Sequence, residues 1–374
     1  MLSRQVSALS GSAPGPATED HRVRAGSATG GYHGEVRRRL MDLVRMMALL
    51  LLVGTAAAQP TVPKDTLPER FWEAGWPFGL GEPPAGWSES LGVDRIALGR
   101  ALFFDPVLSI DRSVACASCH RPDAGFASHE ALPLGAAGKR ALRHPPSLYN
   151  RALGTLHSWD GKARSLREQV VLPISNPNEM GLALEDGIGR LQADIGYVRR
   201  FTSAYGGGPN EERLADALAL FVSRLTLGDS PVDRFQAARD RAALTQEERK
   251  GLWIYESKGR CWSCHSGPNF TDEAFHNSGI GVVDNQPEDG RMAVTGDVAD
   301  RGGFRTPTLR GLLQSAPYMH DGSLKTLEEV VAFYRRGGND NPFRDPRLTP
   351  LDLTDEDATS LIAFLKALSR RAQD

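Results

Sequence analysis

The 374-residue sequence predicts a mainly α-helical protein built from two small domains of the same kind. Two T-x-x-E patterns, Thr245–Glu248 and Thr326–Glu329, fit the capping box that opens a helix, and apolar residues recur at helical spacing after both. We find no convincing alternation of a strand ladder. The five-residue pattern C-x-x-C-H occurs once in each half, at 116–120 and 261–265, which supports two domains.

The remaining elements follow from the same rules. The helix after Thr245 runs toward the second C-x-x-C-H, and the helix after Thr326 carries Tyr334. A last helix starts near Thr354 and presents apolar residues at helical spacing. Two more helices are expected at 94–104 and 211–224, and the Gly, Pro and Asn content predicts loops at 206–209 and 339–342.

The two C-x-x-C-H runs contain all four cysteines and predict two covalently bound haems. The haem-attaching thiols are Cys116 and Cys119 in the first run and Cys261 and Cys264 in the second, and each is followed by a histidine that can bind the iron, His120 and His265. Zinc is the first alternative, but zinc ribbons place their cysteine pairs about 15 to 20 residues apart. A pair of redox disulfides is the second, but it needs no histidine after each pair.

The N-terminal region predicts export. Arginines at 37–39 and Arg45 precede the apolar run 46–53, and three alanines end at Ala58. This is the pattern of a secretory signal peptide, with an uncleaved amphipathic anchor as the alternative. Residues before about Met41 are interpreted as a mis-assigned start or a disordered extension. Because haem is attached to such motifs outside the cytoplasmic membrane, we expect a periplasmic protein.

The expected organisation is a signal peptide with its upstream extension at 1–58, a first haem domain at 59–227 and a second at 228–374. Beyond residue 58 the chain has 37 Lys and Arg against 42 Asp and Glu, a net charge of −5. This mild acidity argues against nucleic acid as a partner.

From Leu91 to Leu368 the chain resembles the bacterial di-haem cytochrome c peroxidases and their relative MauG, which matures methylamine dehydrogenase. The resemblance rests on the order and spacing of several segments together. These segments are Leu98–Pro106, Cys116–His120, Pro146–Asn150, Trp159–Gly161, Cys261–His265, Arg305–Arg310 and Ala316–Gly322. It implies cytochrome c-like haem domains, a peroxide-reacting first haem, and a second haem that stores or relays an electron.

At the first haem, the resemblance makes His120 the proximal ligand and matches Glu179 to the catalytic glutamate, an acid and base for O–O cleavage. A loop-capping carboxylate is the alternative for Glu179. Trp159 matches a tryptophan between the haems, and core packing is its alternative role. Classical peroxidases cap the resting iron with a histidine, but that position falls on Ala136 here. The first haem is therefore expected to be five-coordinate, unless a one-gap realignment brings in His129 or His144.

At the second haem, His265 is the proximal ligand and the sixth-ligand position falls on Tyr334, where the peroxidases have methionine and MauG has tyrosine. A phenolate favours ferric and higher oxidation states, so this haem should have a low potential. Met319 is the competing ligand, and packing in the core is the alternative role of Tyr334.

The family also holds a structural calcium ion between the haems through an asparagine side chain and backbone carbonyls. The carbonyl positions match Ser315 and Pro317, but His144 takes the place of the asparagine. Because imidazole is a poor ligand for Ca²⁺, calcium binding is in doubt in this chain.

We therefore expect a periplasmic di-haem peroxidase that reduces hydrogen peroxide. Its electrons would come from a small cytochrome or a cupredoxin, or from residues of a protein substrate as in MauG; Tyr334 and Ala136 favour the latter. The alternative is a non-enzymatic di-haem electron carrier, which needs two six-coordinate haems. The resemblance also allows a homodimer.

Overall fold

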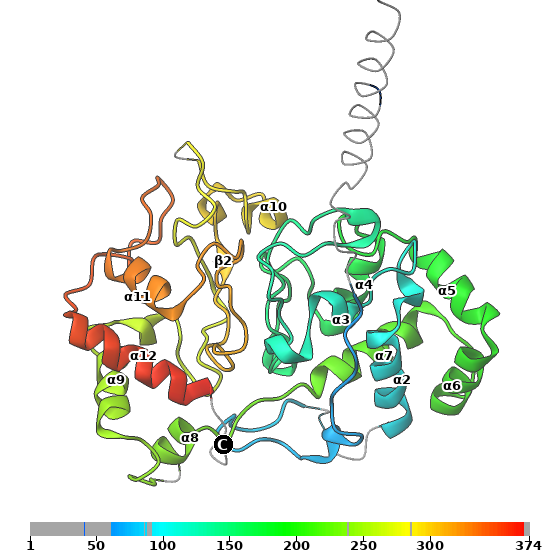
Figure 1. The fold of residues 1–374 in the computed structure, drawn as a ribbon, viewed down its shortest axis with the longest axis horizontal. Helices are drawn as coiled ribbons and strands as arrows, with labels where there is room; N and C mark the ends of the chain where they lie inside the picture. Colours follow the sequence, from blue (N-terminus) through cyan, green and yellow to red (C-terminus); the bar gives the residue numbers. More distant parts are fainter. Residues whose placement is uncertain are drawn as a thin grey trace, which may run out of the picture. The chain divides into compact units, whose positions relative to one another are not determined.

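The computed structural model describes residues 41, 61–85, 87, 92–237, 239–284 and 286–369 (Figure 1). The expected signal peptide and extension at 1–58 lie outside the described residues, apart from Met41. Residues Gln59–Asp374 form one compact unit. In the part of the chain that the structure describes, no helix is long and apolar enough to span a membrane.

The described residues are mainly helical, as predicted. The α-helices of the first half are α2 (Val93–Phe104), α3 (Cys116–Cys119), α4 (Leu166–Ser175), α5 (Leu184–Ala193), α6 (Ile195–Tyr205) and α7 (Glu211–Ser223). Those of the second half are α8 (Pro231–Gln236), α9 (Gln246–Glu256), α10 (Met292–Thr295), α11 (Leu327–Arg335) and α12 (Asp355–Ser369). Two-residue strands β1 (Phe275–His276) and β2 (Phe304–Arg305) pair antiparallel. The 3-10 helices are η1 (Phe71–Glu73), η2 (Pro106–Leu108), η3 (Pro122–Ala124), η4 (Ala136–Gly138), η5 (Arg151–Leu153), η6 (Cys261–Ser263) and η7 (Val298–Asp300).

The predicted caps form with one difference. Thr245 and Glu248 cap each other's backbone amides at the start of α9. The Thr326 hydroxyl accepts the amide of Glu329 at 3.1 Å, but the Glu329 carboxylate accepts the amide of Lys325 instead of that of Thr326. The glutamate thus reaches one residue further back along the chain.

Each half is organised around a close helix pair, α2 with α7 and α9 with α12. A side chain at Gly99 would overlap the carbonyl oxygen of Ala217, and one at Gly251 would overlap the carbonyl oxygen of Ser360. Glycine is therefore required at both crossings, because any larger residue would push the two helices apart.

Two clusters of buried apolar residues lie on either side of the expected domain boundary. The first runs from Leu98 to Leu225 and the second from Val232 to Leu368. In Figure 1 the first belongs to the cyan-to-green helices and the second to the green-to-red ones. The expected boundary at 227/228 falls in the short interval between these clusters.

Buried polar contacts join the two halves. The Asn150 amide donates to the side-chain oxygen of Asn269 at 3.0 Å. The carboxylate of Glu273 accepts from Arg151 at 2.8 Å and from Arg305 at 3.1 Å, and both arginines are buried. Since a buried charge is costly without a partner, this cluster holds the halves in one arrangement.

Candidate functional site

The first C-x-x-C-H run places an imidazole ready for a metal. Its cysteines begin and end α3, and Nδ1 of His120 lies 2.9 Å from the carbonyl oxygen of Phe126. A carbonyl oxygen can only accept, so Nδ1 carries the proton and Nε2 keeps its lone pair. Burial lowers the pKa of His120 to about 4, so the ring is neutral at pH 7.

The second run repeats this arrangement. Nδ1 of His265 lies 3.1 Å from the carbonyl oxygen of Phe270, and burial lowers the pKa of this histidine as well. Phe126 and Phe270 both have positive φ angles, 56° and 51°, a conformation that few non-glycine residues adopt. The same unusual turn therefore aims a carbonyl back at the histidine in both halves.

All four cysteines are free thiols. Burial raises the pKa of Cys116, Cys119 and Cys261 to about 12, so in the protein alone these thiols are protonated at neutral pH.

Glu179 lies next to Ala136 and acts electrostatically on the first cysteine pair. The Ala136 amide donates to the Glu179 carbonyl oxygen at 2.6 Å, and the Glu179 carboxylate contributes to the raised pKa of Cys119. Burial raises the pKa of Glu179 itself, although the Asn176 amide opposes this by donating to its carboxylate at 2.6 Å. A carboxyl group with a raised pKa can exchange protons closer to neutral pH.

The two histidines that a realignment would bring to the first haem lie in other surroundings. His129 is exposed and lies 3.5 Å from the carboxylate of Asp123. His144 is buried, with Nδ1 3.1 Å from the carbonyl oxygen of Glu130. In contrast to these two histidines, Ala136 contacts the backbone of Glu179, and its side chain has no group that could cap an iron ion.

Tyr334 and Met319 line one cavity together with Cys261, Cys264 and His265. Burial, followed by the nearby cysteine sulfurs, raises the pKa of Tyr334. In the protein alone the phenol is therefore protonated, and it would become a phenolate only if a bound cation offset the burial. Both candidate sixth ligands thus lie in the cavity of the second motif.

Trp159 lies at the contact between the halves and lines the same cavity. Its indole N–H donates to the His144 carbonyl oxygen at 2.6 Å, and its own carbonyl accepts the Arg305 amide at 2.8 Å. Its ring makes an edge contact with His320 at 6.3 Å between centroids. The indole is therefore held rigidly among groups from both halves.

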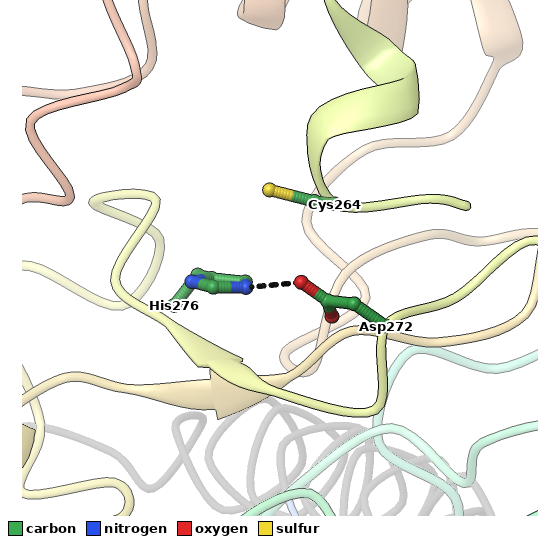
Figure 2. Close-up of side chains that lie close together, drawn as sticks. All are labelled: Cys264, Asp272 and His276. Carbon is green, nitrogen blue, oxygen red and sulfur yellow. Dashed lines mark hydrogen bonds and ion pairs between the residues drawn. The ribbon is translucent and has the colours of Figure 1, made fainter.

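Beside the second motif, ligand atoms of Cys264, Asp272 and His276 lie within 4.8 Å of one another (Figure 2). Nε2 of His276 lies 2.9 Å from Asp272, and Nδ1 lies 2.9 Å from Asp345. Both ring nitrogens thus face carboxylates, and the C-x-x-C-H motif predicts that the Cys264 sulfur attaches haem. The cluster accordingly has no free nitrogen for a metal ion.

Sequence reasoning missed several of these residues: Asn176 against Glu179, the Arg151–Glu273–Arg305 cluster, and the carboxylates around His276. Asn176 could have been found, since an Asn three residues before a buried acid readily donates to it. The Arg151–Glu273–Arg305 cluster joins segments more than a hundred residues apart, so no local sequence pattern indicates it.

The family model for di-haem cytochrome c peroxidase matches residues 93–241. Methylamine utilization protein MauG of Methylorubrum extorquens is 36% identical over 280 residues, which cover 74% of this chain and 79% of that protein. Cytochrome c551 peroxidase of Nitrosomonas europaea is 31% identical over 280 residues, covering 74% and 80%.

Solved structures agree. A MauG-like protein associated with microbial copper homeostasis superposes with a TM-score of 0.69 at 27% identity, covering 82% of this chain and 95% of that one. The di-haem peroxidase BthA of Burkholderia thailandensis has the same fold, with a TM-score of 0.64 at 23% identity and coverage of 75% and 87%.

The fold and the two histidine motifs thus define a haem-containing oxidoreductase. The chain belongs to the family of bacterial di-haem cytochrome c peroxidases and MauG. It is a peroxidase, with hydrogen peroxide as oxidant and an electron donor or a protein substrate as its second partner.

Proposed function

We propose that this peroxidase works in the periplasm with two covalently attached haems and MauG-like iron ligation. His120 would bind the iron of the peroxide-reacting haem, and His265 with Tyr334 the iron of the second. The observation that carries the proposal is the pairing of Ala136 with Glu179: the backbone of an acid with a raised pKa is hydrogen-bonded to a residue that cannot cap an iron ion. The arginines and apolar run before Gln59 support export.

When bound, the first haem supplies the electrons that cleave the O–O bond. The chain supplies the proton transfer. Glu179 takes a proton from the inner oxygen of hydrogen peroxide and returns it to the outer oxygen, which leaves as water. The Asn176 amide holds the carboxylate in position for this transfer. In the full cycle, one hydrogen peroxide, two electrons and two protons give two water molecules.

Trp159 would shorten the electron path between the haems. This role is supported by the position of Trp159 in the cavity of the second motif and by its hydrogen bonds to His144 of the first half and Arg305 of the second. At the second haem, Tyr334 in place of a thioether would favour the oxidised states and so the storage of an oxidising equivalent.

Electrons would then enter at the second haem. Trp262, between the two cysteines of that motif, is 47% exposed, so the segment that would hold this haem is accessible to a donor. A small cytochrome or a cupredoxin can donate there, as can a residue of a protein substrate. Tyr334 and Ala136 favour the protein substrate, because at both positions the residue differs from that of the classical peroxidases and resembles MauG.

Electron paramagnetic resonance of the ferric holoenzyme tests this function. We expect a high-spin signal from the first haem that disappears after one equivalent of peroxide without any reductant. Tyr334→Met should abolish this stored oxidised state, whereas Tyr318→Phe, a control in the same cavity, should keep it. The proposal of an open first haem would be refuted by two low-spin signals that do not change with peroxide until one of the two haems has been reduced. That result would indicate a conventional peroxidase with a capped first haem.

A further inference from the structure

His144 is a hydrogen-bond junction between three segments of the chain. Its backbone amide donates to the His320 carbonyl oxygen at 2.7 Å, and its carbonyl oxygen accepts the Trp159 indole N–H at 2.6 Å. Its Nδ1 lies 3.1 Å from the Glu130 carbonyl oxygen and 3.2 Å from that of Ala131. The side chain is only 3% exposed. One residue thus joins the 130–131 loop, Trp159 and the second half of the chain.

The surroundings of the ring determine its protonation. Two carbonyl oxygens face Nδ1, so Nδ1 carries a proton, and burial lowers the pKa of His144. The ring is therefore neutral. The backbone of Ser315, like those of Glu130 and Ala131, opposes part of this lowering of the pKa, so Ser315 also lies close to the ring. Nε2 is fully buried and has no hydrogen-bond partner among the described residues.

This arrangement does not suit calcium. Ser315 and Pro317, the expected carbonyl ligands, line the same cavity as His144, and the Ser315 backbone lies close enough to the His144 ring to affect its pKa. Ca²⁺, however, takes six to eight oxygen ligands, and a neutral imidazole nitrogen is a poor substitute for an amide oxygen.

We propose that His144 replaces the calcium ion in this chain. Its backbone holds Trp159 against the segment around His320, and its ring ties that junction to the 130–131 loop. The enzyme then needs no calcium, and the single residue at position 144 determines this. The proposal depends on the contacts of His144 and not on peroxide chemistry, so its test is independent of the proposed function.

The first experiment uses the wild-type holoenzyme. We expect elemental analysis to find no calcium after purification in calcium-containing buffer. Neither EGTA nor added Ca²⁺ should shift the midpoint of thermal unfolding, because an ion that binds only the folded state would raise it. One retained calcium per chain, or an unfolding midpoint lowered by EGTA, would overturn the proposal.

The second experiment restores the amide oxygen. His144→Asn should gain one calcium ion per chain by isothermal titration calorimetry, and Ca²⁺ should raise its unfolding midpoint. His129→Asn is the matched control: it makes the same change at an exposed histidine in the same loop and should gain no calcium. A folded His144→Asn protein that binds no calcium would show that His144 is not what excludes the ion. If the variant does not fold, the wild-type measurements still decide.

Discussion

The two C-x-x-C-H motifs have nearly identical histidine surroundings but different neighbouring residues. In both, a buried neutral histidine donates through Nδ1 to the carbonyl of a phenylalanine with positive φ. Other neighbours differ: Glu179, whose backbone is bonded to Ala136, acts on the first cysteine pair, whereas Tyr334 and Met319 line the cavity of the second motif. In the proposed enzyme the shared motif would therefore hold each haem, and residues distant in sequence would determine what each haem can do.

The largest expected effect comes from removing one haem at a time. Cys116→Ser with Cys119→Ser should lower the covalent haem content from two to one and reduce peroxide consumption to the background rate. Cys261→Ser with Cys264→Ser should also leave one haem but keep a peroxide-reactive high-spin site. Haem content by absorbance and peroxide consumption by electrode give the two readouts. Equal loss of activity in both variants would contradict the assignment of the peroxide reaction to the first haem and of electron storage or relay to the second.

The next effect is expected at Glu179. Replacing it by Gln should slow the reaction with peroxide by about 10²- to 10⁴-fold, the usual contribution of a positioned acid and base. The spectrum of the second haem should not change. Stopped-flow absorbance measures the rate, and an unaltered rate would leave Glu179 only a loop-capping role.

The pH profile distinguishes this role further. Burial raises the pKa of Glu179, and only the carboxylate can accept the first proton. The wild-type rate should therefore fall as the pH drops through that raised pKa, and the Gln variant should lack this decline. Asn176→Ala removes a hydrogen bond that stabilises the carboxylate, so the decline should move to higher pH.

The smallest expected effect comes from adding a cap. Ala136→His places an imidazole where the backbone contacts Glu179, at a position that is 2% exposed. The first haem should change from high-spin to low-spin in the ferric state, and its reaction with peroxide should become dependent on prior reduction. Lys139→His, an exposed control in the same loop, should change neither property. A high-spin Ala136→His protein would mean that residue 136 does not face the iron.

The sequence indicates a large part of the candidate site because the patterns that predict it are local. Two cysteines and a histidine within five residues identify each haem motif, and Thr245 with Glu248 identifies the start of α9. Counting residues without gaps along the resemblance also selected Tyr334, and in the structure Tyr334 lines the cavity that contains the second C-x-x-C-H motif. These features depend on residues only a few positions apart or on ungapped segments, so packing elsewhere does not alter them.

The sequence by itself determined the mainly helical class, the family and the residues that can attach two haems. Only the tertiary structure decided which groups surround them. It put Ala136 against the backbone of Glu179, joined Glu273 to two arginines from different halves, and left Nε2 of His144 buried without a partner. The physical reason is that these contacts depend on burial and close packing between segments far apart in the chain. The free-energy cost of burying a polar atom depends on the groups packed around it, and a local sequence pattern does not identify those groups.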